Sequence, residues 1–209
     1  MKELIGTGTA LITPFTEDYR IDFDALSRII EQQIAGGTNY FVMLGTTGES
    51  VTLSKEEKVA VVTHIKTVNA GRLPLVLGVG GNYTAEVVNQ LKNLDTNGLT
   101  AILSVSPYYN KPNQQGILHH YKEVADNSPL PIILYNVPGR TGSNMTAATQ
   151  LELAKHPNIV ATKEASGNME QVMTLLANKP HDFLVISGDD ALTLPILACG
   201  GSGVISVIN

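Results

Sequence analysis

Short apolar segments alternate with longer amphipathic segments along the whole chain. Nearly all of the short segments are continuously apolar rather than alternately apolar and polar, which is typical of strands buried on both faces of a parallel sheet. The pattern predicts strands at Gly8–Thr13, Tyr40–Leu44, Leu73–Gly78, Ala101–Val105, Ile132–Tyr135, Ile159–Lys163, Phe183–Ser187 and Gly203–Val207.

Helices are predicted in the amphipathic segments between these strands. A helix from Asp22 to Gly36 has an apolar face made of Leu26, Ile29, Ile30 and Ile34. Ser54 and Glu57 form a capping box at the start of a second helix. The buried stripe of that helix is expected to contain Val59, Val62 and Ile65. Further helices are predicted from Thr84 to near Asn97, and at Gln114–Ala125, Ala147–Lys155, Met169–Asn178 and Ala191–Cys199.

Repeated strand–helix units predict a parallel α/β architecture. Eight strands favour a closed (β/α)8 TIM barrel over an open, doubly wound sheet. We find no linker and no shift in composition, so a single catalytic domain is expected over residues 1–209. In such a barrel, the active site forms at the C-terminal ends of the strands.

The composition narrows the classes of partner and location. The chain has 209 residues, a net charge of −5 and no cluster of Lys and Arg, so nucleic acid is not an expected partner. Its apolar runs are far shorter than the roughly 20 residues of a membrane span. The single cysteine, Cys199, allows no internal disulfide and is expected to be a small core residue. The first residues lack the apolar core of a signal peptide, and a cytoplasmic protein is expected.

The loop after the second predicted strand, Gly45–Ser50, is rich in glycine and hydroxyl side chains. It is either a tight turn or a cradle for an anion, in which backbone amides and the hydroxyls of Thr46 and Thr47 converge on a carboxylate. No Gly-Lys-Ser/Thr follows, so the loop is not a P-loop.

Aromatic and basic side chains stand at the ends of the fourth and fifth predicted strands. Tyr108 and Tyr109 follow the fourth strand, Tyr135 ends the fifth, and Arg140 comes soon after it. Two tyrosines beside a proline are also compatible with a simple packed loop. At adjacent strand ends, however, phenols and a guanidinium make a pocket with proton carriers and a carboxylate clamp.

Lys163 ends the sixth predicted strand, whereas the other lysines lie in loops, at the terminus or in helical segments. Burial in the mouth of a barrel lowers the pKa of a lysine amine and exposes a nucleophile. Such an amine condenses with a ketone to give a Schiff base. The alternative is an ion pair between Lys163 and Glu164 or another acid, and the strand by itself leaves both interpretations open.

The paired acids Asp189 and Asp190 follow the seventh predicted strand. They are compatible with a metal site or a general base, but an aspartate at a helix N-terminus is also a common cap, and the cap is favoured. The five histidines show no metal-ligand spacing, so no metal site is predicted.

Six motifs occur in order along the chain: GTTGES at 45–50, PYYNKP at 107–112, YNVPGRTG at 135–142, TKEASGN at 162–168, SGDD at 187–190 and GVISV at 203–207. Together they resemble, over the whole chain, the dihydrodipicolinate synthase family of pyruvate-dependent, Schiff-base-forming barrel lyases. The resemblance implies condensation of pyruvate with L-aspartate 4-semialdehyde to 4-hydroxy-tetrahydrodipicolinate, the first committed step of diaminopimelate and lysine biosynthesis. No metal or organic cofactor is expected, because the Schiff base itself is the electron sink.

The resemblance also implies roles for individual residues. Lys163 would form the Schiff base with pyruvate, and Tyr135 would act as general acid and base. Thr46, Tyr135 and Tyr109 would relay protons. Tyr109 would reach the neighbouring subunit's site in a homotetramer built as a dimer of dimers. Substrate binding is expected of Thr47, Arg140, Gly188 and Ile205.

An allosteric lysine site is implied at Ser50, Asn82, Glu86 and Tyr108. Lys55 and Lys58 stand where feedback-sensitive members of the family often carry other residues. Their ammonium groups would repel the cationic side chain of lysine, so weak or absent inhibition is expected.

Two alternative functions are considered. A related pyruvate-dependent aldolase, such as an N-acetylneuraminate lyase or a 2-keto-3-deoxy sugar-acid aldolase, would share the Lys and Tyr but usually lacks the residue that matches Arg140. A catalytically inactive barrel that binds a carboxylate is disfavoured by the presence of Lys163, Tyr135, Thr46 and Tyr109.

The length of the chain adds an expectation about the end of the barrel. A complete (β/α)8 barrel usually needs about 250 residues, and the predicted pattern ends with the eighth strand. The resemblance implies a further helix and a C-terminal helical domain. The barrel is therefore expected to be truncated after strand eight and incomplete at its C-terminus. The outer faces of strands one and eight would then form an exposed apolar patch.

Overall fold

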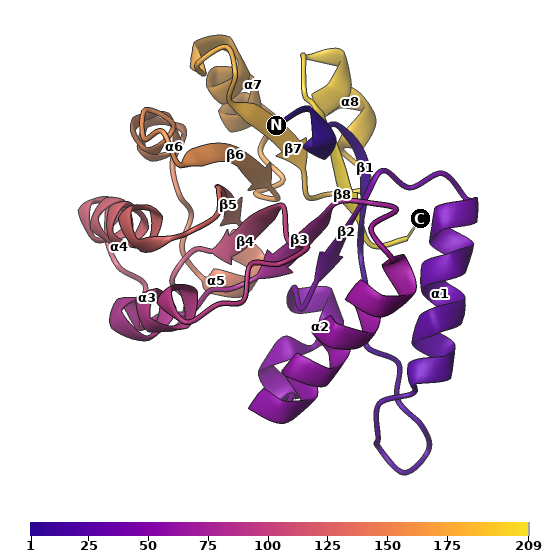
Figure 1. The fold of residues 1–209 in the computed structure, drawn as a ribbon. Coiled ribbons are helices and arrows are strands. Elements are labelled where there is room, and N and C mark those ends of the chain that lie inside the picture. Colours follow the sequence, from indigo (N-terminus) through magenta and orange to yellow (C-terminus); the bar gives the residue numbers. More distant parts are fainter. Residues whose placement is uncertain (209) are drawn as a thin grey trace.

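Parallel strands close into a barrel in the computed structural model, which describes residues 1–208 (Figure 1). Each strand pairs with the next one in sequence, and β8 pairs back to β1. The strands are β1 (Gly6–Ala10), β2 (Tyr40–Met43), β3 (Leu75–Gly78), β4 (Ala101–Val105), β5 (Ile132–Asn136), β6 (Ile159–Glu164), β7 (Leu184–Ser187) and β8 (Gly203–Ser206). The predicted TIM-barrel fold is confirmed, and the open sheet is excluded.

Helices surround the barrel on its outside (Figure 1). They are α1 (Phe23–Ala35), α2 (Lys55–Asn69), α3 (Thr84–Lys92), α4 (Gln114–Asn127), α5 (Pro138–Thr141), α6 (Ala147–Leu153), α7 (Met169–Asn178) and α8 (Thr193–Ala198). Short 3₁₀ helices lie at Lys2–Leu4, Thr46–Gly48 and Ser50–Thr52. The sequence pattern did not predict α5, which is a single turn that begins with a proline.

The start of α2 is as predicted, and its buried face includes Ile65 and the partly buried Val62 as expected, but Val59 is wrongly placed on it. The Ser54 hydroxyl accepts the Glu57 N–H, and the Glu57 carboxylate accepts the Ser54 N–H, so the capping box is confirmed. Val61 and Ile65 are buried on the inner face, whereas Val59 is 66% exposed. Two residues of helix turn a side chain by about 200°, so Val59 and Val61 cannot share one face.

The end of α3 also differs from the prediction. The helix stops at Lys92 rather than near Asn97. The Asp95 carboxylate accepts the Asn97 N–H, and this local turn replaces the helical bonds that the next residues would make.

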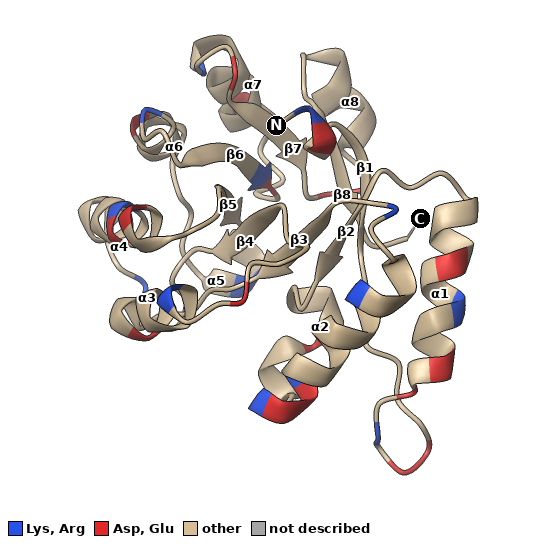
Figure 2. Cartoon of the chain, in the orientation of Figure 1, with Lys and Arg blue, Asp and Glu red and all other residues tan. Residues whose placement is uncertain are grey.

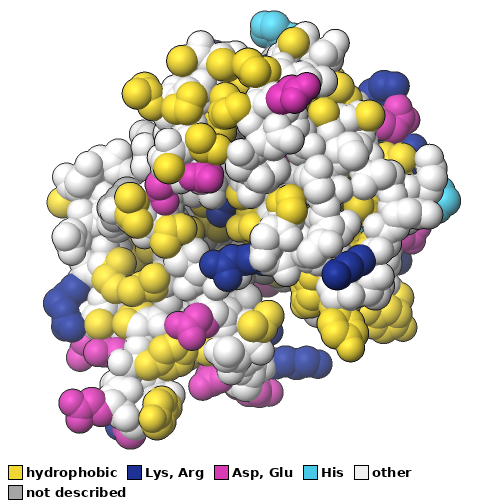
Figure 3. Space-filling model, turned by 180° about the vertical axis from the view of Figure 1, so that it is seen from behind, with side chains coloured by type: hydrophobic (Ala, Val, Ile, Leu, Met, Phe, Trp, Pro, Cys, Tyr) yellow, Lys and Arg dark blue, Asp and Glu magenta, His cyan; other side chains and the backbone are white. Residues whose placement is uncertain are grey.

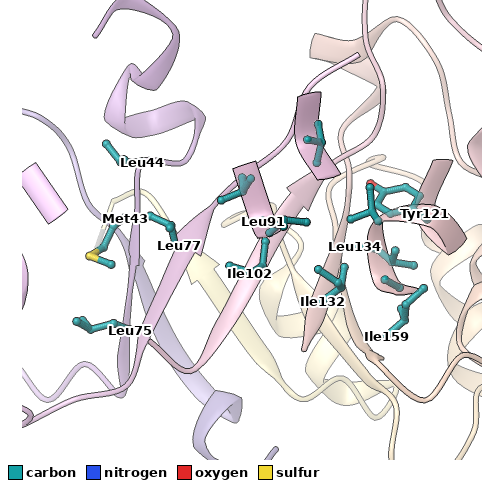
Figure 4. Close-up of a cluster of buried hydrophobic side chains, with 14 of the residues drawn as sticks. Met43, Leu44, Leu75, Leu77, Leu91, Ile102, Tyr121, Ile132, Leu134 and Ile159 are labelled. Carbon is teal, nitrogen blue, oxygen red and sulfur yellow. The ribbon is translucent and has the colours of Figure 1, made fainter. Parts of the chain in front are cut away.

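Buried apolar side chains form two layers, one inside the barrel and one between the strands and the helices. Inside lie Ala10, Tyr40, Val42, Val76, Leu103, Ile133, Ile186 and Ile205. The outer layer, part of which is drawn in Figure 4, includes Met43, Leu75, Leu77, Ile102, Ile132 and Leu134 from the strands and Leu91 and Tyr121 from helices. Because side chains alternate along a strand, successive residues at a strand end face these two different environments.

The outer faces of β1 and β8 do not form the expected apolar patch. β1 begins at Gly6 rather than Gly8, because Gly6 pairs with Gly203 of β8. The outward positions of the two strands are Thr7, Thr9, Val204 and Ser206, which are mainly polar, and Val204 is buried.

Hydrophobic side chains are exposed on α8 instead. Leu194 and Leu197 face solvent there, and Cys199, which was expected in the core, is exposed at the end of the same helix. Hydrophobic side chains gather over the upper part of the face drawn in Figure 3. The apolar sequence around Cys199 therefore does not mark a fully buried helix.

Charged residues lie mainly on the helices and loops, with a basic residue at the end of β6 (Figure 2). In residues 1–208, no helix is both long enough and apolar enough to cross a membrane. The basic residue on β6 lies at the C-terminal end of the strand, where the active site of such a barrel forms.

Candidate active site

Lys163 lies inside the barrel at the C-terminal end of β6. Its side chain is 4% exposed, and its Nζ lies 4.4 Å from the centroid of the Tyr135 ring on β5. The two residues are register partners, so their side chains project from neighbouring strands into the same end of the barrel. Within residues 1–208, Lys163 forms no ion pair. An ion pair with Glu164 is ruled out because that carboxylate faces the other side of the strand.

The Lys163 amine is electrostatically unusual for a lysine. Burial lowers its pKa to about 8, because the ammonium form loses hydration inside the barrel. The negative charge of Asp190 raises this pKa, and the positive charge of Arg140 lowers it. About a tenth of the amine is therefore neutral and nucleophilic at pH 7.

Tyr135 supplies a phenol beside this amine. Its side chain is 7% exposed, and burial raises the pKa of the phenol. The positive charge of Arg140 and a hydrogen bond with the side chain of Thr46 lower that pKa in the opposite direction. The phenol is protonated at neutral pH and can exchange its proton through Thr46.

The loop after β2 brings Thr46 and Thr47 to the same mouth. They lie in a 3₁₀ helix, and the chain turns sharply on both sides of it, with left-handed φ angles of 53° at Leu44 and 52° at Glu49. α5, just beyond β5, brings Arg140 to the same cavity.

These side chains line one open cavity of about 610 Å³. Basic and acidic side chains surround a hollow near the centre of the face drawn in Figure 3. The predicted residues that line the cavity are Thr46, Thr47, Tyr135, Arg140, Lys163 and Gly188. The expected cluster at the strand ends is therefore present.

Gly188 leaves room for the lysine side chain. A Cβ atom at this position would lie 3.0 Å from both Cγ and Cε of Lys163 and 2.9 Å from Cβ of Ala165. Ile205, which was also predicted to bind substrate, is buried among the inner barrel residues and does not line this cavity.

The model of the dihydrodipicolinate synthetase family matches residues 3–209 of the chain. The chain belongs to this family. It is 58% identical to the 4-hydroxy-tetrahydrodipicolinate synthase of Flavobacterium psychrophilum, with the match covering 100% of this chain and 72% of the relative. Identity to the enzyme of that name from Parabacteroides distasonis is 54%, over 99% of this chain and 70% of the relative.

A solved structure supports the same assignment. The dihydrodipicolinate synthase from Cyanidioschyzon merolae, solved with lysine bound, superimposes with a TM-score of 0.92. It is 44% identical in sequence, and the match covers 98% of this chain and 70% of that one. The fold predicted from the apolar pattern is thus the fold of the dihydrodipicolinate synthetase family.

Tyr109, like Ile205, does not line the cavity that contains Lys163. It is 87% exposed, and its φ of 67° is in the left-handed region. Tyr108 lines a second cavity. Of the three residues expected to relay protons, Tyr135 and Thr46 lie together at the first cavity and share a hydrogen bond, whereas Tyr109 does not line it.

The second cavity, of about 310 Å³, adjoins the first and shares Thr46, Tyr135 and Arg140 with it. Two of the four residues predicted for an allosteric site, Ser50 and Tyr108, line it. The other two, Asn82 and Glu86, do not, although Glu86 accepts a hydrogen bond from Gln90, which does. Lys58 also lines the cavity, whereas Lys55 is exposed.

The two acids after β7 have separate local roles. The predicted cap is wrong, because α8 begins only at Thr193 and its N-cap position, Leu192, has no side-chain cap bond; the Asp189 carboxylate instead accepts the Ala191 N–H in a local turn before the helix. The Asp190 carboxylate accepts the Ser206 hydroxyl and the Val207 N–H, and so holds the end of β8. Asp190 also lines the cavity beside Lys163, which the sequence did not predict.

Sequence reasoning missed the polar groups on the outer side of the same strand ends. Glu164 is buried there among the side-chain amides of Asn136, Gln150 and Gln171. The sequence does carry a signal for this cluster. Asn136 and Glu164 are polar, yet each follows an inward-facing strand residue and therefore stands where a strand faces the apolar outer layer.

Proposed function

We propose that the protein is a lyase that condenses pyruvate with L-aspartate 4-semialdehyde to form 4-hydroxy-tetrahydrodipicolinate, through a Schiff base on Lys163. The observation that carries the proposal is the buried Lys163 amine, with its lowered pKa, 4.4 Å from the centre of the Tyr135 ring. The names of the relatives from Flavobacterium psychrophilum and Parabacteroides distasonis support this choice of reaction.

The first half of the reaction joins pyruvate to the chain. The neutral Lys163 amine attacks the ketone carbon of pyruvate, the C–O bond breaks, and water leaves as the imine forms. Tyr135 gives the proton that the departing oxygen needs and is reprotonated through Thr46. The pyruvate carboxylate is held by the backbone at Thr46 and Thr47, whose 3₁₀ helix lies at the cavity.

The second half makes the carbon–carbon bond. The imine withdraws electrons, so the methyl group of pyruvate loses a proton and becomes the nucleophilic carbon of an enamine. That carbon attacks the aldehyde carbon of the semialdehyde, whose carboxylate pairs with Arg140. The amine of the second substrate then displaces Lys163 from the imine, which closes the ring and frees the enzyme. Gly188 shapes the space around these atoms, because a Cβ atom at that position would crowd the Lys163 side chain.

We further propose a homo-oligomer, a dimer of dimers, in which Tyr109 completes the proton relay of a neighbouring subunit. The exposure of Tyr109 and its position outside the cavity of its own chain support this arrangement. Mixing Tyr109→Phe and Lys163→Ala subunits tests it, because hybrid dimers would regain one complete site. An activity of the mixture no higher than the sum of its parts would contradict the exchange.

Weak or absent inhibition by lysine is the regulatory part of the proposal. Lys58 lines the cavity that contains Ser50 and Tyr108, and its positive charge repels the positive charge of a lysine side chain. Half-inhibition by sub-millimolar lysine would contradict this part. A cytoplasmic location is proposed as well, because the single cysteine leaves no internal disulfide to form.

Incubation with pyruvate and borohydride tests the central step. The expected result is a covalent adduct with the mass of one pyruvate, less water, plus the two hydrogens of reduction. The expected second result is consumption of pyruvate when the semialdehyde is added, and no release of pyruvate when N-acetylneuraminate is offered in the lyase direction. A protein that forms no adduct would exclude the Schiff-base mechanism.

A further inference from the structure

Glu164 is a buried carboxylate directly next to the proposed nucleophile. It follows Lys163 on β6, faces the outside of the barrel and is 1% exposed. Within residues 1–208, no Lys, Arg or His forms an ion pair with it. Neutral donors alone therefore compensate its burial.

Those donors come from four segments around the carboxylate. Asn136 Nδ2 on β5 lies 3.1 Å from both carboxylate oxygens, and Gln150 Nε2 on α6 lies 2.6 Å from Oε2. Gln171 Nε2 on α7 lies 3.3 Å from Oε2, and the Ser166 N–H donates to Oε1 at 2.8 Å. One side chain thus ties together two strands, two helices and the loop after β6.

The same amides hold a second acceptor. The Met145 carbonyl accepts from Asn136, Gln150 and Gln171. The Met145 N–H in turn donates to Asn136 Oδ1 at 2.9 Å. The position of the amide donors is therefore fixed from both sides, and the carboxylate fits a site with little freedom to shift.

A carboxyl group is costly to bury here. Neutral hydrogen bonds offset the lost hydration only when their geometry is good. A neutral or apolar residue on this outer face would fill the space at a lower desolvation cost. The carboxylate is thus better explained by what its hydrogen bonds hold in place than by stability alone.

What they hold is the register of β5 and β6. Asn136 is the register partner of Glu164, and Tyr135 is the partner of Lys163. The alternation of side chains puts the first pair outside and the second pair inside, one residue apart. Farther back, Ile132 pairs with Ile159 but Ile133 pairs with Ala161, so the ladder contains an irregularity before it reaches the site.

We propose that Glu164 is a positioning residue, which clamps the ends of β5 and β6 through Asn136 and so holds the Lys163 amine against the Tyr135 ring. The proposal rests on the proposed function, since it needs Lys163 to be the nucleophile. The bond from the Ser166 N–H extends the same control to Ala165, which lines the cavity beside Lys163.

The test compares Glu164→Gln with Val185→Ala in the purified protein. Glutamine keeps the shape but brings an amide group against the amide donors. Val185 is fully buried on the outward face of the neighbouring strand β7, so its truncation disturbs the same layer without touching the clamp. Far-UV circular dichroism and urea unfolding establish that each variant is folded at the assay temperature.

The readout is the rate of adduct trapping at saturating pyruvate, measured across pH. Glu164→Gln is expected to lower that rate roughly tenfold or more, because a displacement of about 1 Å already misaligns reacting groups. Its pH profile should also move upward, because a loosened amine is better hydrated while Tyr135, Arg140 and Asp190 still face it. Val185→Ala should keep both the rate and the profile.

Three outcomes decide the matter. A wild-type protein without any adduct overturns the proposed function and this proposal together. Wild-type trapping with an unchanged rate and profile in Glu164→Gln overturns the positioning role alone. If Glu164→Gln does not fold, Asn136→Ser removes the cross-strand donor and leaves the other three donors. It should then show the same upward shift of the profile, and an unshifted profile overturns the role.

Discussion

Two buried charged side chains stand next to each other on β6, and their surroundings differ in every respect. Lys163 projects into the barrel among apolar side chains and the Tyr135 ring, and forms no ion pair within residues 1–208. Glu164 projects outward and receives hydrogen bonds from Asn136, Gln150, Gln171 and the Ser166 N–H. The comparison teaches that an active site needs one poorly satisfied charge, and that a well-satisfied charge beside it can keep the geometry rigid.

The largest effect is expected from removing the poorly satisfied charge. Lys163→Ala should abolish both adduct formation and turnover, because no other amine lines the cavity among the described residues. The barrel should remain folded, since the ammonium group costs desolvation energy and makes no ion pair. Mass spectrometry after borohydride treatment measures the adduct, and circular dichroism measures the fold. An adduct that persists in Lys163→Ala would show that another amine, and not Lys163, is the nucleophile.

The next largest effect concerns the phenol beside the amine. Tyr135→Phe keeps the ring below Lys163 but removes the proton carrier, so kcat should fall by about 10²- to 10⁴-fold. The reduced adduct should still form, only more slowly. Steady-state kinetics and trapping rates measure the two quantities separately. Full activity of the phenylalanine variant would remove Tyr135 from the proton relay.

Arg140 should separate the two halves of the reaction. Arg140→Ala leaves Lys163 and Tyr135 in place, so trapping with pyruvate should continue, while turnover with the semialdehyde should fall roughly a hundredfold. Loss of the guanidinium charge also raises the pKa of both Lys163 and Tyr135, so the pH optimum should move upward. Equal losses in the two assays would contradict the assigned role.

The smallest effect is one of stability. The pKa of Lys163 is about 8 in the folded protein and 10.5 in an ordinary lysine, so between these values the unfolded chain binds the extra proton. The free energy of unfolding contributed by this group therefore rises as pH increases from about 8 to 10.5. At pH 7, urea unfolding should give Lys163→Met a free energy of unfolding higher than that of wild type by up to about 3 kcal/mol. This difference between the two proteins should become smaller at alkaline pH.

If the difference in unfolding free energy between Lys163→Met and wild type stayed constant from pH 7 to alkaline pH, the Lys163 ammonium would not be desolvated in the fold. The matched variant is Lys155→Met, because Lys155 lies on the surface and pairs with Glu152. Its unfolding free energy should differ from wild type by less than about 1 kcal/mol.

The barrel could be predicted from the sequence because most of the strands are largely apolar runs, as at Ala101–Val105, where the predicted and observed bounds agree. The burial of Lys163 at the barrel mouth could be predicted because a lysine at the end of an apolar strand lies inside the barrel, away from water. Capping at Ser54 was predictable because both of its bonds are local in sequence.

What could not be predicted depends on contacts between distant segments. β1 starts at Gly6 because β8 pairs with it there, and no apolar residue marks that start. The donors to Glu164 come from separate helices, Gln150 and Gln171, whose polarity alone resembles that of any solvated helix residue. Cys199 lies in an apolar segment whose exposed side the sequence pattern does not reveal.

The most direct test of the account is the pH dependence of borohydride trapping, with the modified residue located by peptide mass spectrometry. The account predicts an adduct on Lys163 alone among the lysines, at a rate that rises with pH and levels off with a midpoint near 8. An adduct on a surface lysine, or a midpoint near the ordinary value of 10.5, would contradict the claim that the barrel desolvates this amine and so makes it the nucleophile.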